Sequence, residues 1–280
     1  AAGVWLSALL VALIGTQAIA QAGLISFDDH RFFAADLPLL AIVVGGLLFG
    51  AGMVLTRGCA SRLTVLTGTG NLRALTVILV FALTAHATLK GVLSSLRTGL
   101  GSYTIALENA ALPGSALLWT ALIAVAALAL ILRSGAGLPR LLGGALIGAL
   151  VPLAWVGTGF VLYDDFDPIA MESLSFTAPA ADALFFTAAS TAVSANFGVG
   201  LLGGVVLGAL AAALAFGSFR WQSFETPAQT GRYLLGAVLM GFGGVLAGGC
   251  TVGAGLSGIP TLSLSALAAI ASIVAGTLAT

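Results

Sequence analysis

The chain has very few charged residues. Only 7% of its 280 residues are Asp, Glu, Lys or Arg, whereas soluble domains carry about 25%. So few charges cannot cover a protein surface in water, which excludes an ordinary soluble protein. The ten basic and ten acidic residues cancel to a formal net charge of zero, which argues against a nucleic-acid partner. A hydrophobic content of 59% instead predicts a protein embedded in the lipid bilayer.

Cysteine and histidine are also scarce, with two of each. Two cysteines, Cys59 and Cys250, make neither a disulfide framework nor a CxxC metal motif, and two histidines argue against a zinc or haem site. The glycine-rich stretches lack the GxxxxGK[ST] phosphate-binding pattern. We therefore predict no catalytic residue, no metal site and no cofactor.

Long apolar runs, by contrast, are abundant. Eight stretches approach the roughly 20 apolar residues that cross a bilayer: Gly3–Gly23, Leu37–Thr56, Leu72–Leu89, Ser115–Leu132, Leu141–Leu162, Gly198–Gly217, Tyr233–Ala247 and Leu262–Ala279. Two weaker segments, Gly91–Leu107 and Ala180–Ala195, are interpreted as half-helices, interfacial helices or poorly apolar spans. The prediction is an all-α polytopic membrane protein of about 8–10 membrane helices, a single transmembrane domain over residues 1–280.

Two other features of these runs have simple interpretations. The first run ends in Ala18-Ile19-Ala20, which resembles a signal-peptide cleavage site, but no basic residues precede it. We interpret it as a membrane helix and keep the signal peptide as the alternative. The four tryptophans, Trp5, Trp119, Trp155 and Trp221, are interpreted as anchors at the membrane interface.

A glycine-rich stretch occurs twice. Residues 45–71 read GGLLFGAGMVLTRGCASRLTVLTGTGN, and residues 236–260 read GAVLMGFGGVLAGGCTVGAGLSGIP. When Cys59 is aligned with Cys250, an offset of 191 (250 − 59), the stretches coincide without a gap. A helix rich in glycine that ends in Gly-Cys in both halves indicates a duplicated membrane unit. The coinciding pairs are Gly45 and Gly236, Gly50 and Gly241, Gly52 and Gly243, Leu55 and Leu246, and Gly58 and Gly249.

The number of spans predicts how the two copies are oriented. Five predicted spans precede 198–217, the repeat equivalent of the first span, and an odd number inverts the second copy. The placement of charges between spans agrees with this inversion. Inverted copies would bring the two Gly-Cys loops together at a central constriction. Repeat one covers about 1–110 (motif 45–71), connecting helices about 111–195, and repeat two about 196–280 (motif 236–260).

The residues around each cysteine predict an anion site. Irregular backbone at membrane depth is tolerated only where it is buried in protein or lines a cavity, and successive N–H groups in glycine-rich turns form anion-binding nests. Hydroxyl groups add donors, and arginines add positive charge beside the first cysteine only. The predicted substrate-binding residues are Arg57, Gly58, Cys59, Ser61 and Arg62 in the first loop, and Gly249, Cys250, Thr251 and Gly253 in the second.

Each of these residue types also has a simpler interpretation. Glycines spaced three or four apart are typical of close helix packing, and a free cysteine is commonly a small buried hydrophobe. The arginines, Arg73 above all, are interpreted as residues that reach the membrane interface. Asn71 is predicted to cap the helix from Leu72, and His86 and Lys90 to form a pair at a helix end.

The blocks Gly58–Arg62 (GCASR), followed by Gly70-Asn71-Leu72, and Leu246–Gly253 (LAGGCTVG) resemble the two signatures of the YeeE/YedE sulfur-transport family. Members of this family take up thiosulfate in bacteria. The resemblance implies a multi-pass permease of the bacterial inner membrane, shaped like an hourglass. Its narrow waist would be made by the two cysteine loops, and Cys59 and Cys250 would hydrogen-bond the passing substrate through their thiols.

The resemblance also implies a soluble sulfurtransferase partner in the cytoplasm. Some relatives use a third cysteine near the entrance, and this chain has none, so a relay of three cysteines is not expected. The Ala-Ser-Arg after Cys59 leaves open a subgroup with a different substrate.

The predicted function is transport rather than catalysis: a permease for a sulfur-containing inorganic anion, with thiosulfate as the first candidate. Weak S–H hydrogen bonds suit a large polarisable dianion, because tight binding would prevent release. Three alternatives stay open: a membrane thiol oxidoreductase using Cys59 and Cys250, a permease for another sulfur or selenium species, and a structural membrane subunit.

Overall fold

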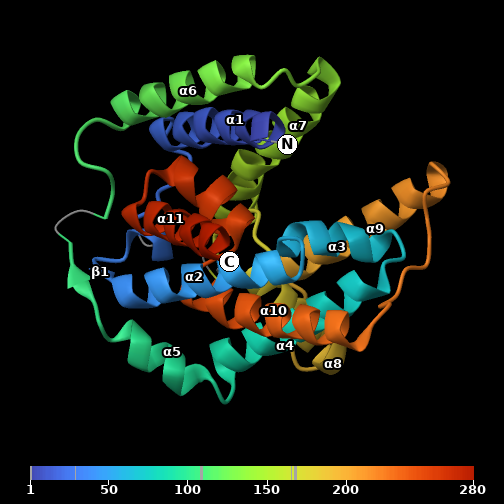
Figure 1. Ribbon diagram of the computed structural model, residues 1–280. Coiled ribbons are helices and arrows are strands. Elements are labelled where there is room, and N and C mark those ends of the chain that lie inside the picture. The colour runs from blue at the N-terminus through green and yellow to red at the C-terminus, as the bar shows by residue number, and fades with distance from the viewer. Residues whose placement is uncertain (1, 29, 108–109, 165, 167–168) are drawn as a thin grey trace. The chain divides into compact units, whose positions relative to one another are not determined.

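The computed structural model describes residues 2–28, 30–107, 110–164, 166 and 169–280, and these are mostly helical (Figure 1). Asp29, Asp165 and Asp167, three of the charged residues between the predicted spans, lie outside the described residues. The α-helices are α1 (Ala2–Gln21), α2 (Leu39–Leu55), α3 (Ala60–Gly68), α4 (Leu72–Lys90), α5 (Ser94–Gly101), α6 (Ala116–Arg133), α7 (Leu138–Val156), α8 (Thr177–Ala189), α9 (Phe197–Ala215), α10 (Pro227–Leu246) and α11 (Leu264–Ala279). Short 3₁₀ segments are η1 (Arg31–Phe33) and η4 (Ile259–Thr261), π-helical segments are η2 (Gly157–Val161) and η3 (Thr251–Gly258), and the strands are β1 (Asp36–Leu37) and β2 (Ile105–Ala106).

Among the described residues, seven helical stretches are long and apolar enough to cross a bilayer, so the predicted all-α polytopic membrane fold is confirmed. Each of the eight predicted spans corresponds to a helix. The α10 helix begins at Pro227, six residues before the predicted start at Tyr233, because Thr226 caps it by accepting a hydrogen bond from the Gln229 N–H (3.3 Å). Both weak segments hold only short helices, eight residues in α5 and thirteen in α8, below the length of a full span.

The chain forms two compact units, and each combines segments of both predicted repeats. Unit 1 comprises residues 1–37, 105–174 and 253–267, and unit 2 comprises residues 38–104, 175–252 and 268–280. Both cysteines therefore lie in unit 2, together with the residues on either side of them, 56–62 and 247–252.

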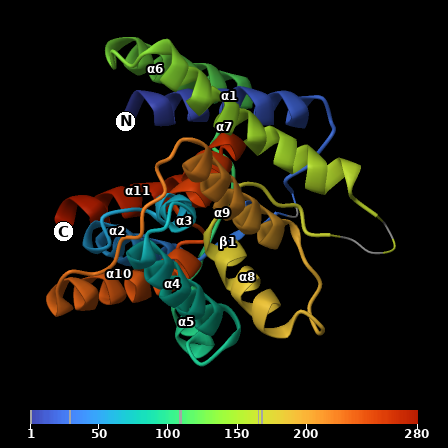
Figure 2. The same ribbon diagram turned by 90° about the vertical axis from the view of Figure 1, so that its right-hand side faces the viewer.

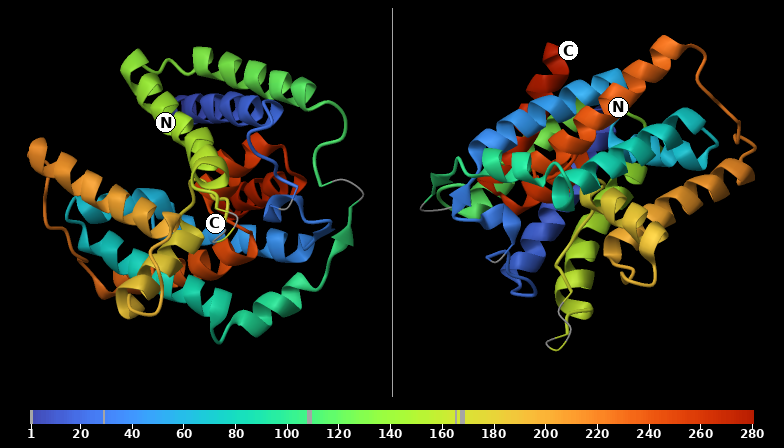
Figure 3. Two further views of the ribbon diagram at one scale, coloured as in Figure 1. Left: turned by 180° about the vertical axis from the view of Figure 1, so that it is seen from behind. Right: turned by 90° about the horizontal axis from the view of Figure 1, so that it is seen from below.

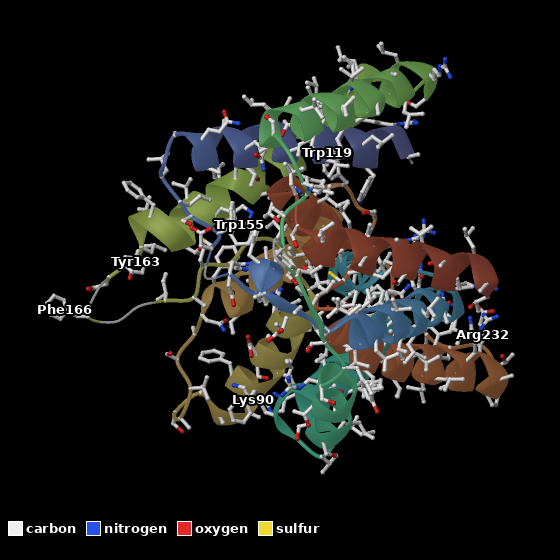
Figure 4. The ribbon with its side chains drawn as sticks, turned by 90° about the vertical axis from the view of Figure 1, so that its left-hand side faces the viewer. Lys90, Trp119, Trp155, Tyr163, Phe166 and Arg232 are labelled. Atoms are coloured by element: carbon white, nitrogen blue, oxygen red, sulfur yellow. The ribbon has the colours of Figure 1, made fainter. Side chains whose placement is uncertain are left out.

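In unit 1, α1 packs against α6 and α7 (Figure 1). Gly148 of α7 lies so close to Ala8 of α1 that a Cβ atom would overlap the Ala8 carbonyl. Trp155 of α7 is only 2% exposed and contacts the Phe27 and His30 rings, each at a centroid distance of 5.1 Å (Figure 4). The interpretation of Trp155 as an interface anchor is therefore wrong, because its ring packs inside the unit.

In unit 2, the glycines of α2 and α10 let the two helices cross in close contact. A Cβ atom on Gly45 would lie 2.7 Å from the Gly243 carbonyl oxygen, and one on Gly236 would lie 2.8 Å from the Gly52 carbonyl oxygen. These contacts pair the start of one glycine run with the end of the other, so α2 and α10 run in opposite directions. Each contact is also the repeat counterpart of the other, which is the pattern of a two-fold axis. The two inverted repeats are confirmed.

The other helices of unit 2 continue this arrangement. Gly241 of α10 contacts Phe81 and Thr84 of α4, while its counterpart Gly50 of α2 contacts the backbone around Ile273 in the second half of α11. The α3 helix packs on α9 (Figure 3), and α8 packs on both α4 and α9 (Figure 2). Close packing of glycine faces, the simpler interpretation of these glycines, therefore holds for Gly45, Gly50, Gly236 and Gly241.

Candidate functional site

The first cysteine lies in a turn, the Cys59 turn (residues 56–62), that ends α2. The Gly58 N–H donates to the Met53 carbonyl (3.1 Å) and the Arg57 N–H to the Val54 carbonyl (3.1 Å). These two bonds form a Schellman motif, which satisfies carbonyl groups at the end of a helix. The motif requires a left-handed residue, and here that residue is Arg57, with φ of 59°. A left-handed arginine is strained relative to glycine.

The second cysteine follows the same kind of turn, the Cys250 turn (residues 247–252), at the end of α10. The Gly249 N–H donates to the Gly244 carbonyl (2.9 Å) and the Gly248 N–H to the Val245 carbonyl (3.2 Å). Gly248 holds the left-handed position, with φ of 73°. The two turns therefore share their backbone hydrogen bonds one for one, at the repeat offset of 191 (248 − 57).

Cys59 is half-buried and begins α3 as its N-cap residue, with extended backbone (φ −76°, ψ 165°). Its Sγ lies 3.2 Å from the Ser61 Oγ, so the thiol and the hydroxyl form one polar pair. The Arg62 guanidinium donates to the Arg57 carbonyl (3.4 Å), and both arginine side chains are exposed. A thiol, a hydroxyl, a helix N-terminus and two positive charges are thus gathered within seven residues.

Cys250 has quite different surroundings, because its side chain is completely buried. It belongs to a cluster of packed side chains that also contains Ala60, the residue after Cys59, together with Phe49 and Met240. Thr251 is half-buried and opens the π-helical segment η3, in which Gly253 is buried. Thr251 and Gly253, the predicted hydroxyl and glycine, therefore follow Cys250 closely in the chain. The Cys250 turn contains no arginine.

The structure brings the predicted site residues of unit 2 together in two groups: Arg57, Gly58, Cys59, Ser61 and Arg62 in one, and Gly249, Cys250 and Thr251 in the other. Gly253 is the first residue of a segment that belongs to unit 1. Because Ala60 and Cys250 share one buried cluster of unit 2, the two turns border the same core. The meeting of the two sulfur atoms at a central constriction stays a prediction.

The groups at these turns can bind a ligand through hydrogen bonds. A protonated thiol is a weak donor, and a helix N-terminus attracts anions. In the part of the chain that the structure describes, no group of three His, Cys, Asp or Glu residues could hold a metal ion.

Three other residues named in the sequence analysis make specific contacts in the structure. Asn71 caps α4, because its side chain accepts a hydrogen bond from the Ala74 N–H (3.0 Å), as predicted. Arg73 forms an ion pair with Glu225 (3.6 Å) and donates to the Gln222 side chain (3.3 Å). His86 stacks on Phe185 of α8, with a centroid distance of 4.9 Å.

Sequence reasoning missed Ser175 and Thr177, two hydroxyl residues at the start of α8. Both are buried, and neither hydroxyl has a hydrogen-bond partner among the described residues. The weak segment was predicted to begin at Ala180, three residues after the true start. The signal that was available is Pro179, since proline favours the first turn of a helix.

Unit 1 contains a cavity of about 470 Å³ near the end of α1. Gln17, Phe27 and Thr261 are among its lining residues, and Asp28 supplies the charged side chain of the lining. A negatively charged wall without arginine or lysine among its described lining residues does not favour an anion, so we do not include this cavity in the candidate site.

Comparison with known proteins identifies the family of this chain and two of its relatives. The chain matches the profile of the Sulphur transport family over residues 2–137 and 134–279. It is 29% identical over 281 residues to the thiosulfate transporter TsuA of Escherichia coli K12, covering 89% of this chain and 75% of that protein. It is 28% identical over 278 residues to the thiosulfate transporter TsuA of Spirochaeta thermophila, covering 88% of this chain and 77% of that protein.

Proposed function

Because the chain belongs to the Sulphur transport family, we propose that this multi-pass membrane protein is a permease for a sulfur-containing inorganic anion. Thiosulfate is the first candidate substrate, since both relatives described above are named as thiosulfate transporters. The proposed location is the inner membrane of a bacterium. The proposed route passes the Cys59 turn and the Cys250 turn.

The Cys59 turn supplies the attraction for the anion. Arg57 and Arg62 are exposed at this turn, and a fixed positive charge raises the local concentration of a dianion. The Cys59 thiol and the Ser61 hydroxyl, 3.2 Å apart, would then take over part of the hydration shell. The strained backbone of Arg57 supports this role, because strain of this kind concentrates at functional sites.

The cysteines supply contacts that are weak enough for release. A thiol donates a weaker hydrogen bond than a hydroxyl or an amide, and conduction requires binding that allows both entry and exit. Gly58 and Gly249, with their neighbouring N–H groups, add donors at the same turns. Thr251 and Gly253 complete the proposed set at the second cysteine.

The observation that carries this proposal is that the two cysteines of the chain follow turns with identical backbone hydrogen bonds in two inverted repeats. The test is uptake of radiolabelled thiosulfate by proteoliposomes that contain the wild type, Cys59→Ala or Cys250→Ala. We expect each variant to lose most of the uptake, because each removes one contact of the route. Thr76→Val, which removes a hydroxyl bonded within α4 (2.8 Å to the Leu72 carbonyl), is the control and keeps full uptake.

Full uptake by both cysteine variants would remove the thiols from the mechanism. Competition by sulfite, sulfide and selenium oxyanions in the same assay identifies the substrate within its chemical class. A thiol oxidoreductase is not supported, since the relatives are named as transporters. A cytoplasmic sulfurtransferase that receives the imported sulfur is part of the proposal, tested by co-purification with the detergent-solubilised permease.

A further inference from the structure

The two cysteine turns differ in the charge that they offer to an anion. At the repeat positions of Arg57 and Arg62, the second repeat has Gly248 and Gly253. A dianion beside the buried Cys250 would therefore need other donors to replace its hydration shell.

The start of α8 lies against the last turn of α10, which leads into the Cys250 turn. Thr177, the first residue of α8, faces Gly244 of α10 so closely that a Cβ atom on Gly244 would lie 3.1 Å from the Thr177 Oγ1. The Gly244 carbonyl is the acceptor for the N–H of Gly249, the residue before Cys250 (2.9 Å). Phe176 and Ala180 of the same helix end belong to the buried cluster that contains Cys250. Figure 2 shows α8 beside the core helix α4.

Two hydroxyl groups at this helix end are buried without a partner. The exposed fractions are 8% for Ser175 and 3% for Thr177, and within the described residues neither Oγ atom has a hydrogen-bond partner. A buried hydroxyl that makes no hydrogen bond destabilises the fold. Such groups call for an explanation, and a ligand that completes them is one.

The helix end itself is electrostatically open. The α8 helix has thirteen residues, no side-chain cap and no acidic residue in its first turn. The first N–H groups of a helix have no partner within the helix, and together with the helix dipole they attract anions. Asp182 lies in the second turn, where its carboxylate accepts a hydrogen bond from Asn196 (3.1 Å).

We propose that Ser175, Thr177 and the first-turn N–H groups of α8 bind the transported anion beside Cys250, in the role that the arginines have at the Cys59 turn. This inference rests on the proposed function and adds a binding site to it. Neutral donors suit the buried end of the route, because they bind an oxyanion without the strong attraction of a buried positive charge. The oxygen atoms of thiosulfate or a related sulfur oxyanion would accept from the hydroxyls, and the terminal sulfur would face the thiol.

The test compares thiosulfate uptake kinetics of the wild type, Thr177→Val and Ser175→Ala in proteoliposomes. We expect Thr177→Val to raise the KM for thiosulfate about tenfold or more, as for the loss of a hydrogen bond to a charged group, and Ser175→Ala to act in the same direction. Thr177→Ser keeps the hydroxyl and should restore uptake. Thr187→Val, which removes an exposed hydroxyl bonded within α8 (3.0 Å to the Ala183 carbonyl), is the matched control.

Thermal unfolding provides a second measurement. If Thr177 only stabilised the fold, its replacement by Val would lower the unfolding temperature, which is the opposite of what we expect. Without substrate, Thr177→Val should unfold at the same or a higher temperature than the wild type, because it removes an unpaired buried hydroxyl. With thiosulfate, the rise in unfolding temperature should be smaller in the variant. A lower unfolding temperature of the substrate-free variant, with unchanged KM, would overturn the inference.

Cys250→Ala and the wild type are measured in parallel, so that failure of this inference can be distinguished from failure of the proposed function. Loss of uptake in Cys250→Ala with an unchanged KM in both hydroxyl variants overturns this inference alone. Absence of thiosulfate uptake by the wild type overturns the proposed function, and the inference with it.

Discussion

The Cys59 turn and the Cys250 turn have the same backbone hydrogen bonds but different side chains. The first places Arg57 in the left-handed position, and the second places Gly248 there. The first cysteine is half-buried, whereas the second is completely buried. After the first cysteine a regular α-helix follows, and after the second a π-helical segment.

The difference shows what a duplication preserves. Backbone hydrogen bonds at the end of a helix depend on chain geometry, so both copies retain them. Side chains are not fixed by these bonds, and here one copy has charged, exposed residues while the other has small, buried ones. Two turns with the same backbone hydrogen bonds can therefore have different electrostatic surroundings.

The largest expected effect concerns the helix crossing that relates the two turns. A Cβ atom on Gly243 would lie 2.5 Å from the Gly45 carbonyl oxygen and 2.6 Å from the Phe49 nitrogen. Gly243→Ala should therefore destabilise the protein by about 3 kcal/mol, because backbone atoms cannot move aside as a side chain can. Gly52→Ala, its repeat counterpart, should cost a similar amount. The measurement is thermal unfolding in detergent.

Gly204→Ala on α9 is the control for that crossing, because no atom lies within 4 Å of the added Cβ. It should be neutral or stabilising, by up to about 1 kcal/mol. Unequal losses in Gly243→Ala and Gly52→Ala would contradict the two-fold relation.

The second effect is a loss of stability at low pH, caused by protonation of His30. It sets the pH range in which variants of the two turns should be compared. Burial of the ring, followed by the charge of Arg31, lowers the pKa of His30 from 6.5 to about 4. The unfolded chain binds this proton at higher pH than the folded protein, so stability is fully present above pH 6.5 and is lost as the pH falls toward 4. Between pH 7 and pH 5 the loss is about 2 kcal/mol. Unfolding temperatures across this range, for the wild type and His30→Phe, measure it.

An equally steep pH dependence in His30→Phe would show that another group causes the loss. Cysteine variants should be compared above pH 6.5, where the protonation of His30 does not alter stability.

The third effect tests the difference in burial between the thiols. In Cys250→Ala the remaining thiol is half-buried Cys59, and in Cys59→Ala it is the fully buried Cys250. N-ethylmaleimide should modify Cys59 at least about tenfold faster, since a buried thiol reacts only when the structure opens locally. Intact-protein mass spectrometry follows both rates. Equal rates would mean that the two thiols have the same access.

The smallest effect concerns the left-handed position. Arg57→Gly should stabilise the protein by about 1 kcal/mol, because glycine adopts positive φ without a steric penalty. The same substitution should slow thiosulfate uptake at low salt, since it removes one positive charge from the Cys59 turn. Gly248→Ala, at the other left-handed position, should reduce stability by a similar amount. Unfolding temperatures and initial uptake rates of both variants provide the comparison.

Most of the fold could be predicted from local sequence. Apolar runs of about 20 residues predict helices, because the bilayer contains no water to hydrogen-bond the backbone and a helix satisfies its own N–H and C=O groups. All eight predicted spans correspond to helices. The start of α10 was misplaced, since Gln229, Thr230 and Arg232 lower the hydropathy there without preventing helix formation. The short α8 was misplaced for a related reason, as Ser175 and Thr177 are polar residues in a buried segment.

The sequence by itself determined the membrane-spanning helices, the duplicated unit and the inversion of its second copy, because hydropathy and spacing are properties of the chain alone. Only the tertiary structure decided which glycines touch, which cysteine is buried, and that the buried hydroxyls of Ser175 and Thr177 have no hydrogen-bond partner among the described residues. Those features depend on contacts between segments far apart in the chain, and burial is a property of the neighbours that a residue acquires when the chain folds.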